Sequence, residues 1–138
     1  MWFYNNKEFT NPSKEDFGFV YKITFPDNSF YIGCKQFYTI RNTKMSKKRV
    51  IAVYTGRGRK PSKEKLVKES NWKIYESSSA LVTSMIQSLG SEVIFQILSI
   101  HKDKQSMILE EARLIINEFS LKSKLILNQW IKITFKKT

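Results

Sequence analysis

Two tyrosines, Tyr21 and Tyr31, are the residues whose type and spacing point most clearly to chemistry. Nine residues separate them, and the turn-forming run Pro26-Asp27-Asn28-Ser29 lies in between. A pair of phenols on neighbouring strands can direct hydrogen-bonding groups at one phosphate, or it can be a core pair with satisfied hydroxyls. The tyrosines alone leave both interpretations open, because cross-strand aromatic pairs also stabilise sheets without taking part in chemistry.

The residues around the tyrosines predict a β-hairpin that would bring them together. Apolar and polar side chains alternate over residues 19–24, which is typical of a strand. Phe30-Tyr31-Ile32 is the expected partner strand, and Pro, Asp, Asn and Ser favour the turn that joins the two. The tyrosines would then lie on adjacent strands.

Positive charge is concentrated in one segment. The chain has a formal net charge of +12, and residues 41–73 contain twelve Lys or Arg and two Glu, a net +10. Concentrated cationic charge binds phosphate backbones by releasing counterions, so nucleic acid is the expected partner. No amphipathic basic helix that would lie on a lipid surface is present. Residues 54–61 are expected to form a flexible loop that becomes ordered on DNA.

The rest of the chain predicts helices that cover a sheet. Ser77, Ser78 and Ser79 are candidate caps for a helix that ends at Gly90, a mostly buried strand follows over residues 93–100, and Asp103 caps a second helix. The apolar stripe expected to pack that second helix on the sheet consists of Ile108, Ala112, Ile115 and Phe119, with Leu109 and Ile116 beside it.

Both ends of the chain are expected to join this sheet. Residues 1–16 form an arm anchored by Trp2, Phe3, Tyr4 and Phe9, and residues 125–128 and 130–135 return as strand. The element order β-β-α-β-α-β predicts an α+β fold, a small sheet flanked by helices.

Length and composition exclude several classes. A chain of 138 residues is long enough for a single domain, 1–138. The lone Cys34 builds no disulfide framework, which favours an intracellular, reducing location. His101 is the single histidine, so a structural zinc site is not expected. The apolar runs are far shorter than the ~20 residues of a membrane helix, and no secretory leader is recognisable.

The sequence resembles the GIY-YIG nuclease family, whose name describes such a hairpin. Tyr31-Ile32-Gly33 matches the second half of the motif, and Gly18-Phe19-Val20-Tyr21 is a looser first half. Further matching segments occur in the order found in small phage-type, homing-like endonucleases of the family: residues 2–4 with Phe9, residues 31–35, 57–59, 72–75, Ser77-Ser78, residues 81–90, 95–98, Glu111-Ala112 and Asn128. The resemblance implies a central three-stranded antiparallel sheet flanked by helices, with an N-terminal arm (1–16) and a basic insertion (35–73).

The resemblance also implies a catalytic set of Tyr21, Tyr31, an arginine, Glu111 and Asn128. Tyr21 would be the base or would orient water, and positive charge from the basic segment would have to lower its pKa from ~10. Tyr31 would contact the phosphate.

The family's arginine follows the Tyr-Ile-Gly strand on a helix, and the matching residue is Arg41. Its planar guanidinium suits bidentate phosphate binding. Arg57 and Arg59 are rivals, and Lys35 follows the strand directly. The remaining expected DNA contacts are Lys47, Lys48, Arg49 and Lys60, and any of these basic residues could bind only the DNA backbone.

By resemblance, Glu111 holds one divalent metal, Mg²⁺ or Mn²⁺, and Asn128 supports the site by hydrogen bonding. Glu111 lies on the flank of the apolar stripe, whereas its neighbour Glu110 points further away. A surface glutamate paired with lysine is the alternative for Glu111. The inter-tyrosine gap is one or two residues shorter than usual, and the family's frequent histidine falls at Met45, for which Tyr75 is a positional substitute.

These features predict a metal-dependent endonuclease that acts on double-stranded DNA, of the phage-type homing or DNA-competition kind. It would be intracellular, in the host cytoplasm if a phage encodes it, with a homodimer on DNA as one arrangement. The alternatives are a catalytically silent DNA-binding module of the same fold, and an RNA-binding protein that stacks bases on exposed aromatic residues.

Overall fold

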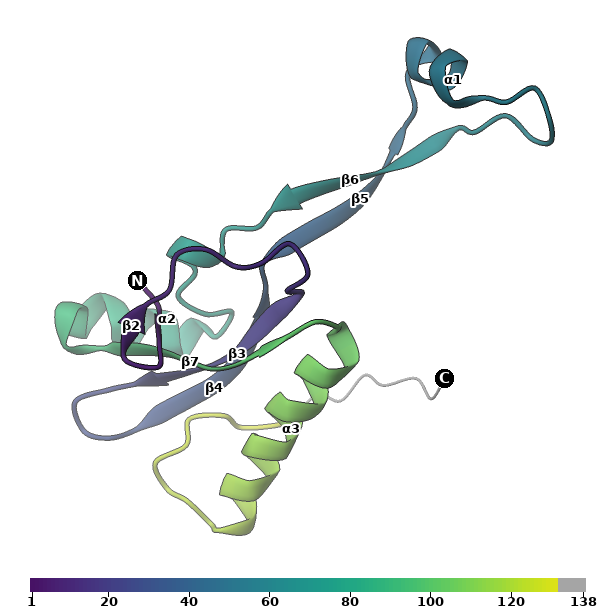
Figure 1. Cartoon of the computed structure of the whole chain (residues 1–138). Coiled ribbons are helices and arrows are strands. Elements are labelled where there is room, and N and C mark those ends of the chain that lie inside the picture. The colour runs from purple at the N-terminus through teal and green to yellow at the C-terminus, as the bar shows by residue number, and fades with distance from the viewer. Residues whose placement is uncertain (132–138) are drawn as a thin grey trace. The chain divides into compact units, whose positions relative to one another are not determined.

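A computed structural model describes residues 1–131 of the chain; residues 132–138 lie outside the described part. The chain divides into two compact units, which we describe separately. The main unit consists of Met1–Phe37 and the described residues from Asn71 onwards, and the ribbon unit is Tyr38–Ser70. The main unit contains β1 (Phe3–Tyr4), β2 (Lys7–Glu8), β3 (Gly18–Thr24), β4 (Phe30–Gln36), α2 (Ala80–Leu89), β7 (Ile94–His101) and α3 (Lys104–Ser120), together with short 3-10 turns at Trp72–Ile74 and Gly90–Glu92 (Figure 1).

The main unit is built on a five-stranded mixed sheet with the order β2-β1-β7-β3-β4. β3 pairs antiparallel with both β4 and β7, which gives the three-stranded antiparallel centre that the sequence predicted. The arm adds two short strands, because β1 pairs in parallel with β7 and antiparallel with β2. The α+β class is confirmed, and the sheet is larger than expected because the arm is part of it.

A buried tryptophan fixes the arm to the sheet. Trp2 is 1% exposed, and its indole N–H donates a hydrogen bond to the Trp72 carbonyl at 2.8 Å. Buried polar groups require hydrogen-bond partners. This bond satisfies the Trp2 indole N–H and the Trp72 carbonyl, which are seventy residues apart in the sequence. The arm is therefore held by a specific contact as well as by apolar burial.

The predicted hairpin is confirmed as β3 and β4. Its turn is stabilised by Asp27, whose carboxylate accepts a hydrogen bond from the Ser29 N–H at 2.9 Å, and by Asn28, which adopts a positive φ of 67°. Asn tolerates this left-handed conformation better than most residues. The register places Tyr21 opposite Gly33 and Ile23 opposite Tyr31.

Both predicted helix starts are confirmed. Ser79 caps α2 by accepting from the Val82 N–H, and Asp103 caps α3 by accepting from the Ser106 N–H at 2.8 Å. The predicted stop at Gly90 is confirmed: it ends α2 with a φ of 59° and a ψ of −120°, a conformation that glycine adopts easily because it has no Cβ.

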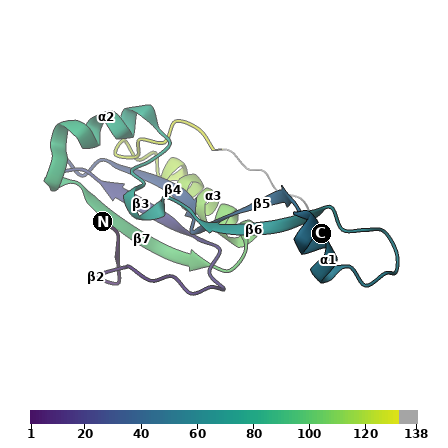
Figure 2. The same ribbon diagram turned by 90° about the horizontal axis from the view of Figure 1, so that it is seen from above.

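α3 packs along β3 and β4 (Figures 1 and 2). The predicted apolar stripe is correct at Ala112 and Ile115, which are buried together with Met107. It is wrong at the outer positions: Phe119 is 38% exposed, and Leu109 and Ile116 are 46% and 48% exposed. The buried stripe is narrower because the helix is covered by the sheet on one side only.

The two faces of β3 carry different cores. One face holds an aromatic cluster that includes Phe19, Tyr21, Phe37 and Trp72, with the Phe19 and Phe37 ring centroids 4.9 Å apart. On the other face Val20 packs with residues from β4 and α3, namely Phe30, Ile32, Met107 and Ile115. Tyr21 thus lies at the edge of an aromatic core, and only 1% of its surface is exposed.

Two sequence predictions about burial and strands need correction. The strand predicted over residues 93–100 is observed as β7, but it is not mostly buried: Ile97 is 2% exposed and Ile94 is 59% exposed. Within residues 125–131 the expected C-terminal strand is reduced to a single bridge between Phe30 and Ile126, because only Leu125 and Leu127 of this segment form backbone hydrogen bonds with β4. Residues 132–135 of that prediction lie outside the described part.

The ribbon unit consists of β5 (Tyr38–Lys44), α1 (Lys47–Val53) and β6 (Lys63–Glu69). β5 and β6 form a two-stranded antiparallel sheet with seven residue pairs, from Tyr38 opposite Glu69 to Lys44 opposite Lys63. The predicted loop over residues 54–61 is confirmed, and Gly56 and Gly58 adopt positive φ values there. The strands were not predicted. In the part of the chain that the structure describes, no helix is long and apolar enough to cross a membrane.

Candidate active site

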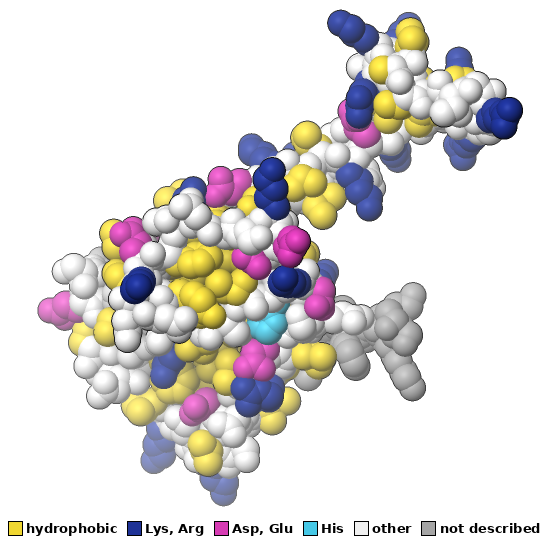
Figure 3. Space-filling model, in the orientation of Figure 1, with side chains coloured by type: hydrophobic (Ala, Val, Ile, Leu, Met, Phe, Trp, Pro, Cys, Tyr) yellow, Lys and Arg dark blue, Asp and Glu magenta, His cyan; other side chains and the backbone are white. Residues whose placement is uncertain are grey.

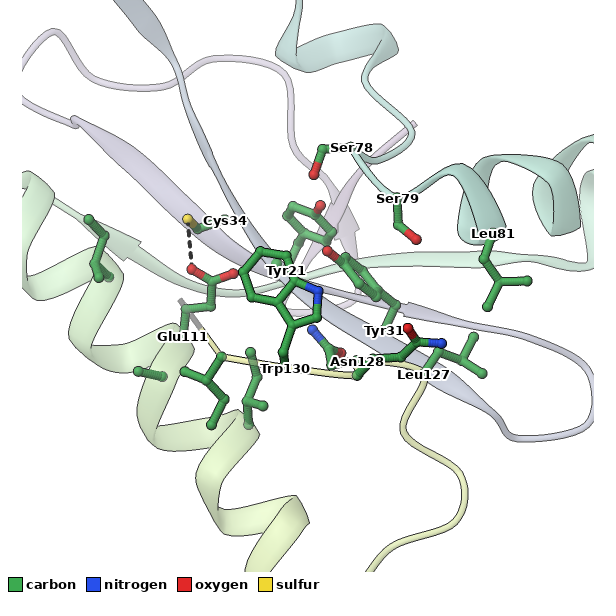
Figure 4. A pocket seen from close by; sticks show the side chains of 16 residues that line it. Tyr21, Tyr31, Cys34, Ser78, Ser79, Leu81, Glu111, Leu127, Asn128 and Trp130 are labelled. Carbon is green, nitrogen blue, oxygen red and sulfur yellow. Dashed lines mark hydrogen bonds between the residues drawn. The ribbon is translucent and has the colours of Figure 1, made fainter. Parts of the chain in front are cut away.

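A pocket of about 580 Å³ lies on the main unit where β3, β4, α3 and the C-terminal segment meet (Figure 4). It contains four of the five residues that the sequence predicted as a catalytic set: Tyr21, Tyr31, Glu111 and Asn128. The other lining residues used below are Gly33, Cys34, Ser78 and Trp130. Residues from distant parts of the sequence therefore meet in one cavity.

The two tyrosine rings lie next to each other as the hairpin predicted. Their centroids are 6.3 Å apart with an interplanar angle of 38°. Tyr21 is fully buried and Tyr31 is half-buried, so the pair has one phenol set in the core and one at the pocket wall. Gly33 makes room for this arrangement, because a Cβ at that position would collide with the Tyr21 phenol. The glycine of the Tyr-Ile-Gly segment is thus required by the tyrosine on the neighbouring strand.

The main unit does not provide the lowered pKa that a role as base would require of Tyr21. Burial raises the pKa of Tyr21 far above its ordinary value, and the neighbouring phenols of Tyr75 and Tyr31 raise it further. A hydrogen bond with Ser77 opposes this shift only in part. Tyr21 therefore remains a neutral phenol at physiological pH and can donate a hydrogen bond.

Tyr31 has a similar environment with less burial. Burial raises its pKa first, the charge of Glu111 and the phenol of Tyr75 raise it further, and hydrogen bonds with Ser78 and Ser77 oppose the rise. The pair thus presents two neutral hydroxyls to the pocket.

Tyr75, which the sequence offered as a substitute for the missing histidine, is next to the pair. Its ring lies 6.1 Å from that of Tyr21 in an edge-to-face orientation, and the Lys35 ammonium sits 4.0 Å from its centroid. Burial lowers the pKa of Lys35. Lys35, expected to contact DNA, therefore reaches the tyrosine cluster through Tyr75. Met45, the position of the family's histidine, belongs to the ribbon unit.

The geometry of α3 separates the two neighbouring glutamates. Glu110 turns to solvent and forms an ion pair with Arg113, with an oxygen–nitrogen distance of 2.6 Å. Glu111 lines the pocket and accepts a hydrogen bond from the Cys34 thiol at 3.0 Å. Burial raises the pKa of Glu111, and the Cys34 hydrogen bond opposes the rise. The solvated ion pair expected as the alternative for Glu111 is found at Glu110.

Asn128 holds the C-terminal segment against the edge of β4. Its side-chain oxygen accepts from the Ile32 N–H at 2.9 Å, and its side-chain nitrogen donates to the Ile32 carbonyl at 2.8 Å. The amide therefore replaces the neighbouring strand that β4 lacks at this point. This pair of bonds also positions Tyr31, whose backbone precedes Ile32.

The three arginines proposed for the catalytic set, Arg41, Arg57 and Arg59, are in the ribbon unit. Arg41 lies on strand β5 and is exposed, so its prediction as a helical residue is wrong; the run Tyr38-Thr39-Ile40 that precedes it favours a strand. Arg57 and Arg59 lie in the loop between α1 and β6. Among residues 1–131, those that line the pocket include neither arginine nor lysine.

Three pocket residues were missed as site residues. Cys34 was considered only as a cysteine without a disulfide partner, Ser78 only as a possible cap, and Trp130 only as part of a strand. Trp130 lines the pocket and is 68% exposed. An aromatic residue two positions after Asn128 was the available signal, since a large exposed apolar side chain near polar groups often marks a binding surface.

The pocket offers the kind of ligand atoms that a hard divalent cation prefers. Its polar groups are mostly oxygens, and Glu111 brings a largely buried carboxylate that accepts from a neutral thiol. Within the described residues no three His, Cys, Asp or Glu side chains come together. One carboxylate completed by water and substrate phosphate is a common way of binding Mg²⁺. Glu111 therefore fits such an ion.

The sheet with its tyrosine hairpin and this pocket is compatible with a nuclease domain of the GIY-YIG type. Residues 2–131 match the family described as "Putative endonuclease segE, GIY-YIG domain", and the chain belongs to this family of endonucleases. It is also similar to Intron-associated endonuclease 2 of Enterobacteria phage T4, with 32% identity over 113 residues, or 82% of this chain and 33% of that protein. The chain thus spans about a third of the length of this curated relative. No solved structure gives a significant match.

Proposed function

We propose that the chain is an active, metal-dependent endonuclease that hydrolyses phosphodiester bonds of double-stranded DNA. The observation that carries the proposal is the meeting of Tyr21, Tyr31, Glu111 and Asn128 in one pocket of a chain from an endonuclease family. In this proposal residues 1–138 act as one nuclease domain, with the ribbon unit as its DNA-binding insertion.

The reaction joins a water oxygen to phosphorus and breaks the bond between phosphorus and the 3′ oxygen. The attacking water gives up one proton to solvent, and the 3′ oxygen takes one up. The products are a 3′-hydroxyl and a 5′-phosphate. Charge develops on the phosphate oxygens, so neutral donors and cations directed at them lower the barrier. The Tyr31 hydroxyl donates to a phosphate oxygen, and the less exposed Tyr21 hydroxyl orients the attacking water.

Tyr21 does not act as the base in this scheme. Since burial raises its pKa, it remains protonated at neutral pH, and its proton is available for hydrogen bonding only. A Mg²⁺ ion held by Glu111 would neutralise the phosphate and lower the pKa of water. Asn128 acts indirectly by keeping the β4 edge and Tyr31 in place.

Arg41 is the first choice for the cation that clamps the phosphate, with Arg57 and Arg59 as rivals. Its guanidinium is exposed on β5, and its planar donor fork can bind two phosphate oxygens at once. Lys35, Lys47, Lys48, Arg49 and Lys60 bind the DNA backbone in this proposal.

The second candidate function is a catalytically silent DNA-binding module. The observation that favours it is the pocket lining, which within the described residues contains no basic side chain. Both functions require salt-sensitive DNA binding. They differ in whether a phosphodiester bond is broken.

Supercoiled plasmid distinguishes the two functions. We expect the parent protein to relax or linearise the plasmid with Mg²⁺ and to leave it intact with EDTA. Glu111→Ala should abolish cleavage while DNA binding is retained. Glu110→Ala is the matched control, because the neighbouring carboxylate faces solvent and pairs with Arg113. Retarded but intact plasmid and genomic DNA with the parent protein would establish the silent module.

A further inference from the structure

The ribbon unit lacks a core that would explain its shape. β5 and β6 form an isolated two-stranded sheet, and α1 contains no buried residue. Large apolar side chains on the strands are exposed: Ile40 is 60%, Leu66 52% and Val67 61% exposed. A two-stranded hairpin is marginally stable in water unless a further surface covers it. Within residues 1–131 these side chains are uncovered, and we look to a partner for such a surface.

The charge of the ribbon unit selects the partner. Residues 38–70 contain eleven Lys or Arg and two Glu, a net +9, and Glu64 is already paired with Arg49 at 3.2 Å. Figure 3 shows basic side chains spread over the visible surface of the ribbon unit, with few acidic side chains among them. A second copy of the ribbon would meet the same positive charge and be repelled. A polyanion is attracted.

The two faces of the ribbon are chemically different. Residues directly opposite each other in an antiparallel pair point to the same face. One face therefore carries the exposed pairs Ile40–Val67, Asn42–Lys65 and Lys44–Lys63, which we call the reading face. The opposite face carries the pairs Thr39–Lys68, Arg41–Leu66 and Thr43–Glu64. There the Thr39 and Thr43 hydroxyls donate to backbone carbonyls of β6 and Glu64 is paired with Arg49, while Arg41 and Lys68 are cations placed for backbone phosphates.

The reading face has the side-chain types that recognise base edges. The major groove of B-DNA, about 12 Å wide, admits a two-stranded β-ribbon. There an Asn amide pairs with adenine, a Lys ammonium with the acceptors of guanine, and apolar side chains contact the thymine methyl group. These three chemistries lie side by side on the reading face, in Asn42, Lys65 and the pair Ile40–Val67. Lys44 and Lys63 follow at the end of the strands next to α1.

We propose that β5 and β6 form a ribbon that enters the major groove of double-stranded DNA, where the reading face contacts base edges and gives the protein its sequence preference. The proposal rests on the proposed function in taking DNA as the substrate. It goes beyond that function because backbone binding and cleavage require no contact with bases. The exposed Ile40 and Val67 are then covered in the complex by the groove.

The test measures sequence preference apart from cleavage. The parent protein, with EDTA present, selects duplexes from a randomised pool, and the affinity ratio of selected to shuffled duplex is then measured for each variant. We expect Asn42→Ala/Lys65→Ala to reduce that ratio about fivefold or more, since one good base contact is worth about fivefold to 150-fold. Thr39→Val, on the opposite face, should retain the ratio. Circular dichroism checks that each variant is folded.

A footprint identifies the groove. We expect the parent protein to protect guanine N7, which lies in the major groove, from methylation by dimethyl sulfate in the selected duplex, and the double variant to lose this protection. A parent protein that selects no motif, or a double variant with unchanged preference and protection, overturns the proposal. Sequence preference without any cleavage in Mg²⁺ would support base reading by the ribbon and refute the proposed nuclease activity. Cleavage without sequence preference would support the nuclease activity and refute base reading.

Discussion

The thiol of Cys34 on β4 donates a hydrogen bond to the carboxylate of Glu111 on α3, with the sulfur 3.0 Å from the oxygen. This bond joins the hairpin to the helix at the pocket wall. It leaves the other carboxylate oxygen of Glu111 available to a cation. Groups that hydrogen-bond to a metal ligand commonly set its orientation, and their loss weakens metal binding by 10–100-fold as an order of magnitude.

Replacing Cys34 should therefore change the metal requirement. We expect Cys34→Ala to raise the Mg²⁺ concentration for half-maximal cleavage by about tenfold, because Glu111 loses its orienting donor. Cys34→Ser retains a hydroxyl donor and should stay within about threefold of the parent, since the orienting bond is kept. Equal Mg²⁺ dependence of the alanine variant and the parent protein would show that the thiol is only a packing group.

Glu111 should destabilise the metal-free protein at neutral pH. Burial raises its pKa in the fold, so the folded state holds the proton more tightly than the unfolded state does. The free-energy cost of burying the ionised Glu111 side chain is largest above its pKa in the folded state. This cost disappears below its pKa in the unfolded state, about 4.3. Glu111→Gln should therefore raise the melting temperature at pH 7 in EDTA, and this gain should shrink as the pH falls toward 4.

Thermal unfolding of Glu110→Gln is the control for that series. Glu110 is stabilised as an anion by Arg113, which lowers its pKa, so its replacement should bring no gain at pH 7. A lower melting temperature for Glu111→Gln at pH 7 would mean that the buried carboxylate is compensated in the folded protein.

The pH–rate profile should be free of a Tyr21 titration. The pKa of Tyr21 is raised by burial above its ordinary value, so the phenol stays protonated wherever the fold is stable. We expect Tyr21→Phe to lower the cleavage rate at least tenfold, a typical effect of losing one positioned group, without changing the shape of the profile between pH 6 and 9. A rate that rises with pH in the parent protein, and loses this rise in Tyr21→Phe, would identify Tyr21 as the base after all.

Asn128 should contribute to stability through the β4 edge. Asn128→Ala leaves the N–H and the carbonyl of Ile32 without their partners, which costs about 1–3 kcal/mol. Urea unfolding measures this loss. Gln129→Ala, at the next and exposed position, should be neutral. An equal effect of both substitutions would show that the segment is held by other contacts.

The basic residues of α1 should set much of the salt dependence of binding. Replacing Lys47, Lys48 and Arg49 by Ala should flatten the plot of log affinity against log salt by up to about 0.9 for each phosphate that the protein no longer neutralises. The same charge change at Lys7, Lys14 and Lys122, on the main unit, is the control. Identical slopes for the two triple variants would place α1 away from the DNA.

Local patterns predicted the parts of the fold that local chemistry determines. The alternation around Tyr21, the turn residues after Pro26, the caps Ser79 and Asp103 and the stop at Gly90 are all observed. Each is decided within a few residues by propensity and capping. The same is true of the hairpin register, which brings the tyrosines together.

Predictions that depended on distant contacts were less successful. The strands of the ribbon unit were missed because lysines are frequent in them, and burial does not mark either face. The pKa of Tyr21 depends on an aromatic core assembled from the arm and from Trp72, which no local pattern reveals. The different directions of Glu111 and Glu110 were predictable because helix periodicity alone separates them.

The contact between Phe37 and Trp72 has a consequence for the architecture of the chain. Their rings meet edge to face at 5.2 Å, and both are buried in the main unit, one just before and one just after residues 38–70. The chain thus leaves and re-enters the main unit at nearly one point. An excursion with adjoining ends adds little strain to its host. We therefore expect residues 38–70 to behave as an independent insertion, so that a tight turn or another sequence in their place leaves the pocket assembled.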